Sequence, residues 1–220
     1  MPINSSAVDK VAYAKSLGLD FVICDHHIPG ETLPEANAIL NPKQAGCEYP
    51  FKELCGCAIG FKLMCALEST LKNSNEDCFK YLDIVATATA ADIVSMSGEN
   101  RVLVALGLRQ LNLNPSNGLQ ALVEVSGLNE RRKELDSRSL VFQLAPRINA
   151  AGRLYHASMA RKIISGKKEE VLADAAQLNA VNVERQGLCT VIQKEASLAL
   201  EDNQYEYSQV VASPDWNKGV

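Results

Sequence analysis

The apolar run from Phe21 to Cys24 constrains the fold most strongly. A short, continuously apolar segment is typical of a strand covered on both faces, as in the parallel sheets of α/β proteins. The stretch before it, from Val8 to Leu19, has apolar residues at helical spacing and a turn at Gly18. Residues 36–40 indicate a second short strand. The sequence therefore predicts an α/β fold with a parallel sheet near its start.

The remainder of the chain has a predominantly helical pattern. Apolar residues recur at helical spacing in segments 57–69, 77–91, 100–111 and 118–126. Residues 157–201 predict a short helix and then a long one, and residues 209–213 predict another strand. Very little chain precedes the sheet, and the last strand begins a unit that is not completed. We therefore expect a fragment of a longer protein.

The composition excludes several classes of protein. Of 220 residues, 47% are hydrophobic and 22% are charged, which argues against a disordered chain, a collagen or a coiled coil. No segment approaches the roughly 18 uninterrupted apolar residues of a membrane-spanning helix, and Met1 to Lys10 lacks the features of a secretory signal. These observations predict a soluble, cytoplasmic protein.

The seven cysteines favour reduced thiols over a disulfide framework. A zinc site is the alternative, but the four cysteines that could form it lack CxxC spacing, and two of them lie in an apolar helical run: Cys47, Cys55, Cys57 and Cys65. Buried core thiols are the preferred interpretation.

The charge is unevenly distributed along an acidic chain. Residues 131–168 contain ten basic and two acidic residues, a local charge of +8, while the net charge of the whole chain is −4. Such a segment predicts either an anion-binding face or a solvated loop.

Asp25, His26 and His27 directly follow the first strand. Ligands of open α/β sheets bind at the carboxyl ends of the strands, so this triplet lies where a functional site is expected. A carboxylate with two imidazoles suits a divalent transition metal such as Mn²⁺ that polarises a nucleophilic water. The alternative is a set of surface loop residues.

Two aspartates lie in or beside the helical segment 77–91. Asp92 ends a run of small residues that permits close helix packing, which could bring its carboxylate against the end of the sheet. Its alternative role is a hydrogen bond at the helix end. We expect Asp83 to be an exposed helix residue.

Residues 145–153 combine Arg147, Asn149, Gly152 and Arg153 in a segment that we expect to be irregular. Guanidinium groups bind phosphate through two hydrogen bonds, and glycine permits close backbone approach. The segment could hold a phosphodiester near a metal; the alternative is a turn with ordinary surface arginines.

Together these motifs resemble the RecJ family of single-strand-specific exonucleases in the DHH phosphoesterase superfamily. The resemblance runs from about Ser5 to Val220 and is carried, in order, by Asp25-His26-His27, by residues 55–63, by residues 91–94, by Gly98-Glu99-Asn100-Arg101 and by residues 146–153.

The resemblance implies a role for each matching residue. His26 and Asp92 would be metal ligands, His27 would position phosphate or water, and Asp25 would support the site. The side chains expected at the DNA phosphates are Arg147, Asn149 and Arg153, and those expected in a helix between two domains are Asn182, Arg185 and Gln186.

The family's other motifs are missing from the sequence. Its first two aspartate motifs would lie before Met1 and just before Ile3, and the nucleotide-binding motif of its second domain would follow Val220. We therefore expect residues 1–155 to be a DHH catalytic domain without its N-terminal strands and aspartates. Residues 156–203 would be connecting helices, and residues 204–220 would begin the second domain.

The implied activity is a Mn²⁺- or Mg²⁺-dependent 5′ to 3′ exonuclease acting on single-stranded DNA in repair and recombination. Single-stranded DNA would be its partner, with a single-strand-binding protein and a helicase as further partners. The chain alone would have weak or no activity, because ligands of the metal centre are missing from it. The alternatives are a DHH phosphodiesterase of short oligonucleotides or cyclic dinucleotides, and a non-catalytic scaffold.

Overall fold

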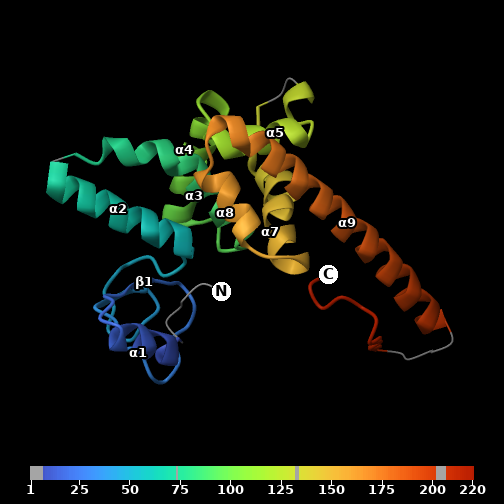
Figure 1. Cartoon of the computed structure of the whole chain (residues 1–220), viewed down its shortest axis with the longest axis horizontal. Coiled ribbons are helices and arrows are strands. Elements are labelled where there is room, and N and C mark those ends of the chain that lie inside the picture. Colours follow the sequence, from blue (N-terminus) through green and yellow to red (C-terminus); the bar gives the residue numbers. More distant parts are fainter. Residues whose placement is uncertain (1–6, 73, 132–133, 202–206) are drawn as a thin grey trace. The chain divides into compact units, whose positions relative to one another are not determined.

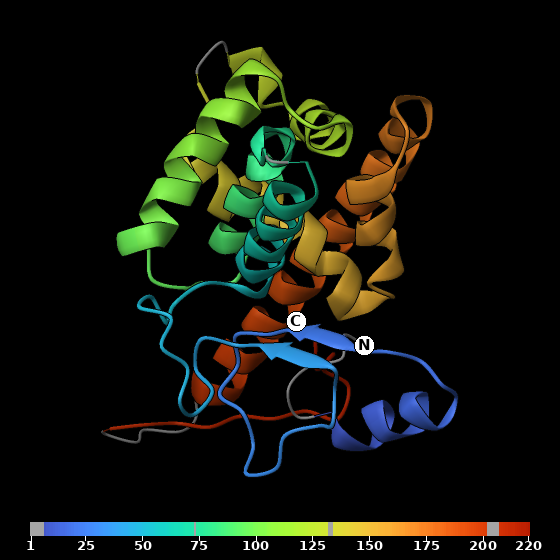
Figure 2. The same cartoon turned by 90° about the vertical axis from the view of Figure 1, so that its left-hand side faces the viewer.

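The computed structural model describes residues 7–72, 74–131, 134–201 and 207–220. They divide into two compact units: Met1–Ser116 with Glu134–Phe142, and Asn117–Lys133 with Gln143–Val220. Figures 1 and 2 show helices throughout and a small sheet near the N-terminal end. This mostly helical architecture with a small parallel sheet confirms the predicted fold class.

The first unit begins with helix α1 (Val8–Ser16) and strands β1 (Val22–Cys24) and β2 (Ala38–Leu40). The two strands are parallel, and Ile23 lies opposite Ile39. Gly18 ends the α1 segment with a φ of 73°, which confirms the predicted glycine turn. Only one face of β1 is well covered: Ile23 is 2% exposed, whereas Val22 is 54% exposed. The expectation of a strand covered on both faces is therefore wrong for the described residues.

Three helices and a 3₁₀ turn complete most of the first unit: α2 (Gly56–Lys72), η1 (Glu76–Tyr81), α3 (Leu82–Ala91) and α4 (Gly98–Leu113). The core packs α2 against α3 through Ala58, Ile59 and Val85. Helices α3 and α4 approach closely at Gly107, where a Cβ atom would lie 2.2 Å from the carbonyl oxygen of Leu82. The small residues of α3 allow this packing, as the sequence suggested.

The unit also contains α6 (Ser137–Ser139), and η3 (Leu140–Leu144) is a π-helical turn that leads into α7 of the second unit. In α6, Asp136 and Ser139 form a capping box.

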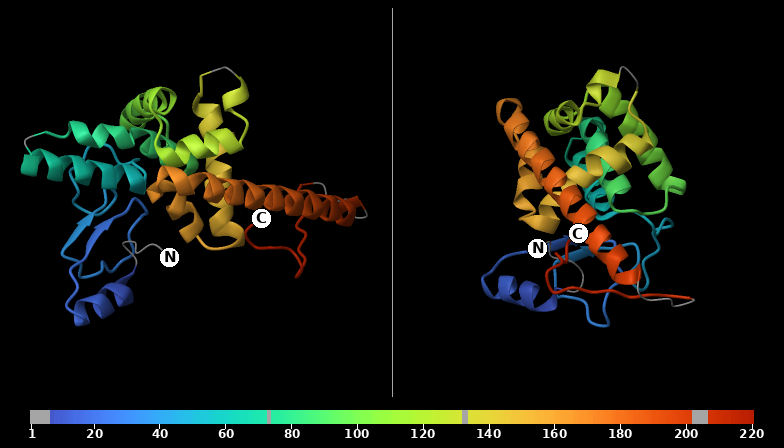
Figure 3. Two further views of the ribbon diagram at one scale, coloured as in Figure 1. Left: turned by 45° about the horizontal axis from the view of Figure 1, so that its top comes forward. Right: turned by 90° about the vertical axis from the view of Figure 1, so that its right-hand side faces the viewer.

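The second unit consists of helices and a C-terminal segment. Its elements are α5 (Asn117–Val125), η2 (Asn129–Arg131), α7 (Ala145–Leu154), α8 (Ser158–Ser165) and α9 (Lys168–Glu201). In Figure 3, α9 is the long orange to red helix. It buries a stripe formed by Val171, Ala175, Leu178 and Val181, whose spacing matches the helical repeat. The predicted short helix followed by a long one corresponds to α8 and α9.

The predicted strand at residues 209–213 is wrong. This segment has no regular secondary structure, and Val210 is 94% exposed. The described part of the second unit offers no strand for it to pair with. Residues 204–206, which we assigned to the start of a further domain, lie outside the described residues.

Candidate metal centre

Asp25 organises the loop at the carboxyl end of β1. Its backbone N–H donates to the carbonyl of Leu40 at 3.0 Å, which extends the pairing of the two strands. Its side chain is almost buried, and its Oδ1 accepts hydrogen bonds from the backbone N–H groups of His26 and His27 at 2.9 and 3.3 Å. The same oxygen lies 2.7 Å from Nδ1 of His27. Asp25 therefore fixes the backbone of both histidines and the ring of His27.

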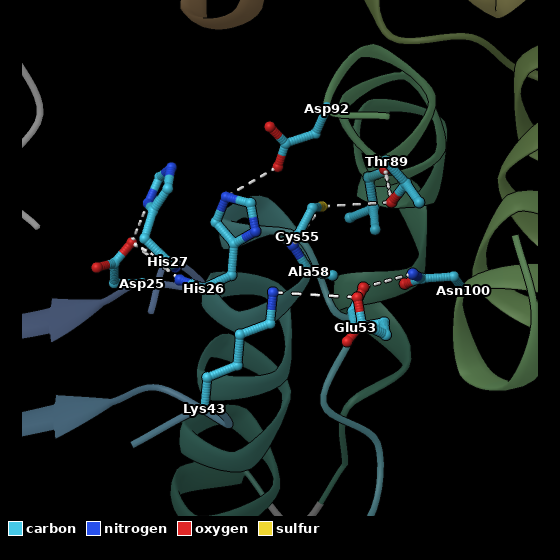
Figure 4. Close-up of polar contacts among 11 residues, drawn as sticks. Asp25, His26, His27, Lys43, Glu53, Cys55, Ala58, Thr89, Asp92 and Asn100 are labelled. Carbon is cyan, nitrogen blue, oxygen red and sulfur yellow. Dashed lines mark hydrogen bonds and ion pairs between the residues drawn. The ribbon is translucent and has the colours of Figure 1, made fainter. Parts of the chain in front are cut away.

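His26 and Asp92 meet although they are far apart in the sequence. Nε2 of His26 lies 3.1 Å from Oδ2 of Asp92. Figure 4 shows the imidazole of His26 pointing toward the Asp92 carboxylate, and the ring of His27 lies beside it with the two ring centroids 4.4 Å apart. The side chain of His26 is 13% exposed and that of Asp92 is 39% exposed, so the pair is reachable from solvent.

The start of α2 shapes one side of this pair. A Cβ atom on Gly56 would lie 3.6 Å from Cδ2 of His26, so the helix begins in contact with the imidazole. The adjoining Cys55 is buried, and its Sγ lies 3.4 Å from Oγ1 of Thr89 on α3. This contact links the start of α2 to the helix that carries Asp92.

The small residues of α3 bring Asp92 to the site. Ala86 and Ala90 are buried, and Asp92 caps the helix with its N–H donating to the carbonyl of Ala88 at 3.0 Å. This backbone hydrogen bond is one that any residue could make at a helix end, whereas the carboxylate of Asp92 lies at Nε2 of His26. The role of Asp92 as a metal ligand stays a prediction.

Asp83 was expected to be exposed, and this expectation is wrong. The residue is 0% exposed, and its Oδ2 accepts a 2.6 Å hydrogen bond from the backbone N–H of Ser116. The buried face of α3 includes position 83 because α4 covers this helix closely.

Two buried asparagines near the site were missed. Asn41 follows β2 and donates from Nδ2 to the carbonyl of His27 at 2.8 Å. Asn100 donates from Nδ2 to the carbonyls of Glu53 and Ser95, at 2.6 and 2.8 Å. The position of Asn41 at a strand's carboxyl end was the available signal for the first, and the Gly98 to Arg101 motif was the signal for the second.

A charged network lies beside α2. Glu99 accepts 2.6 Å hydrogen bonds from the Tyr49 hydroxyl and from Nζ of Lys62. Burial alone would raise the pKa of Glu99, but the two hydrogen bonds prevail and lower it. The bond to Glu99 raises the pKa of Lys62. A largely apolar cavity of about 280 Å³, lined in part by Leu40, Tyr49 and Lys62, adjoins this network.

The cysteines do not form one class. Cys55 is buried, which confirms the expectation of a buried core thiol there. Cys47 and Cys65 are half-buried, and the expectation is wrong for Cys57, which is exposed. Cys57 lies on the solvent-facing side of the first turn of α2, whereas its neighbours Ala58 and Ile59 are buried. Among the described residues, no group of three or more His, Cys, Asp or Glu side chains could hold a metal ion.

The arginine segment is helical rather than irregular. Helix α7 tolerates Pro146 because the ring lies in its first turn, where the missing N–H has no helical partner. Arg147 is half-buried, with Nε donating to Oδ1 of Asn179 at 2.8 Å and Nη1 donating to the carbonyl of Gln143 at 2.6 Å. Burial lowers the pKa of Arg147.

Asn149 and Arg153, one helical turn apart on α7, are exposed. Nη1 of Arg153 donates to the carbonyl of Gly219 at 3.0 Å. In α9, Asn182 is buried and accepts weak hydrogen bonds from Arg185 at 3.3 and 3.4 Å. These residues belong to the second unit, whereas Asp25, His26, His27 and Asp92 belong to the first.

Comparisons with known proteins relate the chain to one family of phosphoesterases. Residues 3–89 match the DHH family, N-terminal domain. The chain is 39% identical over 219 residues to the single-stranded-DNA-specific exonuclease RecJ of Bacillus subtilis, covering 98% of this chain and 27% of the relative. It is 33% identical over 226 residues to RecJ of Escherichia coli, covering 96% and 39%. The chain thus spans less than half the length of these relatives.

Solved structures of RecJ share the fold. RecJ from Thermus thermophilus in complex with Mn²⁺ matches with a TM-score of 0.81 and 27% identity, covering 98% of this chain and 32% of the other. Another exonuclease RecJ bound to manganese matches with a TM-score of 0.79 and 27% identity, covering 96% and 52%.

Proposed function

We propose that the chain contributes to a divalent-metal-dependent exonuclease that hydrolyses phosphodiester bonds of single-stranded DNA in the 5′ to 3′ direction. Its residues 3–89 match the DHH family, N-terminal domain. The observation that carries the proposal is the 3.1 Å separation between Nε2 of His26 and Oδ2 of Asp92 at the carboxyl end of β1. The role in repair and recombination and the cytoplasmic location are part of the same proposal, and they rest on the likeness to RecJ.

The donor set fits part of a metal centre. One imidazole nitrogen and one carboxylate oxygen are donors that suit Mn²⁺, and the carboxylate also suits Mg²⁺. When bound, the ion would neutralise phosphate charge and lower the pKa of a bound water, which then becomes a nucleophile at neutral pH. The remaining coordination positions are open to water, to phosphate oxygens and to ligands beyond the described residues.

The neighbouring residues have supporting roles in this proposal. Asp25 fixes the loop. Its contact with Nδ1 of His27 orients the imidazole, so that the other ring nitrogen, Nε2, is directed to solvent. The side chain of His27 is 64% exposed, so it can reach a phosphate oxygen or the attacking water. Because Nδ1–H of His27 donates to Asp25, Nε2 of the neutral imidazole is an acceptor and would orient the attacking water.

Helix α7 is the proposed contact to the DNA backbone. Asn149 and Arg153 are exposed on α7 and can donate to phosphate oxygens. Arg147 is held by Asn179 and Gln143, which leaves its Nη2 for a phosphate and presets the guanidinium orientation. The basic segment 131–168 would add electrostatic attraction for the strand.

The domain assignment is also a proposal. Residues 1–155 would form the DHH domain, residues 156–203 the connecting helices, and residues 204–220 the beginning of a further domain. The length of α9, which has 34 residues, supports a connecting role. A single-strand-binding protein and a helicase are the proposed further partners.

The experiment is a chimera in which this chain replaces the aligned segment of the Bacillus subtilis relative. It is assayed for Mn²⁺-dependent digestion of a 5′-phosphorylated single-stranded oligonucleotide. We expect nucleotides to be released from the 5′ end, with a loss of at least about 100-fold for His26→Ala and for Asp92→Ala. Asp77→Ala is the matched control, because Asp77 is an exposed carboxylate that forms an ion pair with Lys72.

Each contrary result has a defined meaning. Undiminished activity of a folded His26→Ala chimera would contradict the metal role. Activity confined to very short oligonucleotides would point to the phosphodiesterase alternative. A folded chimera that binds Mn²⁺ and DNA without cleaving would point to the scaffold alternative.

A further inference from the structure

Ile93, the residue after Asp92, has a backbone conformation that isoleucine rarely adopts. Its φ is 55°, in the left-handed region, and every other described residue with positive φ is a glycine. A β-branched side chain clashes with its own backbone there, so the conformation is disfavoured. Strained residues of this kind persist where the surrounding structure imposes them, and they cluster at functional sites.

The side chain of Ile93 gains nothing from folding that would offset this strain. It is 91% exposed. An apolar side chain in water contributes no burial to stability, and glycine would occupy the same backbone conformation without the clash. Within the first unit, both the conformation and the exposure of Ile93 are unfavourable for folding.

Hydrogen bonds on both sides hold the turn that carries Ile93. On one side, the N–H of Asp92 donates to the carbonyl of Ala88 at 3.0 Å, which ends α3. On the other side, Nδ2 of the fully buried Asn100 donates to the carbonyl of Ser95 at 2.8 Å. The same amide donates to the carbonyl of Glu53, just before α2. The turn is therefore anchored to α3 and to the segment before α2, and in it Ile93 directly follows Asp92.

We propose that Ile93 contacts a nucleobase of the bound single strand, at the nucleotide whose phosphate lies at His26 and Asp92. The inference rests on the proposed function. The bases of a single strand have exposed faces that stack on flat or apolar protein surfaces. Isoleucine is among the side chains that proteins place in contact with bases. A base contact beside the metal site would position the phosphate without reading the sequence. Ile93 is thus a substrate-positioning residue.

The test uses variants of the whole chain that separate the side chain from the backbone. Ile93→Gly keeps the left-handed turn and removes the apolar surface, while Ile93→Leu restores an apolar side chain. Leu113→Ala is the matched control, since Leu113 is 73% exposed at the end of α4. For each protein the Tm and the Mn²⁺ affinity are measured first.

DNA binding is then measured by fluorescence anisotropy in Mn²⁺, with a 5′-phosphorylated oligothymidine whose phosphorothioate linkages resist cleavage. A second oligonucleotide has the same backbone, but its 5′-terminal nucleotides lack bases. The difference between the two affinities reports the contribution of the bases alone, because both probes carry the same phosphates.

We expect Ile93→Gly to weaken binding of the base-bearing strand by roughly threefold to tenfold. Its binding of the abasic strand and its Mn²⁺ affinity should be unchanged, and Ile93→Leu should recover part of the loss. The Tm of Ile93→Gly should rise, because the strain is relieved. Loss of binding together with a gain in stability is the signature of a functional side chain and is not produced by a purely structural one.

Two results would overturn the base contact while leaving the proposed function intact. In the first, Ile93→Gly binds each strand as tightly as the unsubstituted chain does. This result would favour a protein segment as the partner of Ile93. The other is an equal loss for both strands, which would indicate an effect through the backbone. Failure of the unsubstituted chain to bind either strand would also overturn the base contact, and digestion of single-stranded DNA by the chimera then decides the proposed function separately.

Discussion

Oδ1 of Asp25 lies 2.7 Å from Nδ1 of His27 and also accepts hydrogen bonds from two backbone N–H groups. We expect Asp25→Ala to lower the free energy of unfolding by about 1–3 kcal/mol, because these donors lose a nearly buried acceptor. Urea denaturation of the chain measures the change. Asp9→Ala, at the exposed start of α1, is the control and should cost less than about 0.5 kcal/mol. Equal effects of the two substitutions would contradict this role.

Asp83 provides a second stability test. Because its Oδ2 accepts the backbone N–H of Ser116 in a fully buried position, Asp83→Ala should destabilise the chain by roughly 1–3 kcal/mol. The exposed Asp77 supplies the matched substitution Asp77→Ala, with an expected change within about 0.5 kcal/mol. The measurement is the Tm of each variant, monitored by circular dichroism. Equal Tm values for Asp83→Ala and Asp77→Ala would contradict the role of Asp83.

The Glu99 network predicts a dependence of stability on pH. Hydrogen bonds from Lys62 and Tyr49 lower the pKa of Glu99 in the folded state, against the opposing effect of burial. A lowered folded pKa contributes stability above the ordinary carboxyl value of 4.5, and this stability is lost as the pH falls through the folded value. Glu99→Gln should therefore be about 0.5–1 kcal/mol less stable than the unsubstituted chain at pH 7.

The difference between Glu99→Gln and the unsubstituted chain should shrink below pH 4.5. Urea denaturation at several pH values measures it. A difference that grows in acid would contradict the assigned direction of the shift.

The salt dependence of DNA binding tests helix α7. If Arg153 neutralises one phosphate of a single strand, Arg153→Ala should reduce the slope of log affinity against log salt by about 0.7. Arg109→Ala on α4 is the control, since that arginine is also exposed but lies outside the basic segment 131–168. Indistinguishable slopes for the two variants would remove Arg153 from the interface.

Much of the architecture was predictable because its signals are local. The apolar run at Phe21 to Cys24 predicted β1, and helical spacing predicted α2 through α5, α8 and α9. The triplet after β1 indicated where a site would form, because strand ends in such sheets have a fixed relation to function. The small residues before Asp92 correctly indicated that this carboxylate could approach the sheet.

The errors and omissions depend on contacts between distant parts of the chain. The burial of Asp83 depends on α4, and the role of Asn100 depends on the carbonyl of Glu53, which the local sequence does not reveal. Residues 209–213 have the composition of a strand but lack a pairing partner among the described residues. The strain at Ile93 could not be predicted from the sequence, because a β-branched residue is not expected in a left-handed turn.

The measurement that tests the central claim most directly is a double-mutant cycle of Mn²⁺ affinity, using the chain with His26→Ala, Asp92→Ala and both substitutions. If Nε2 of His26 and Oδ2 of Asp92, 3.1 Å apart, bind one ion, each single substitution should weaken Mn²⁺ binding by at least about tenfold. The Mn²⁺ affinity of the double variant should then lie within about threefold of the affinity of the weaker-binding single variant. Fully additive losses, or an affinity unchanged by either substitution, would contradict a shared metal site.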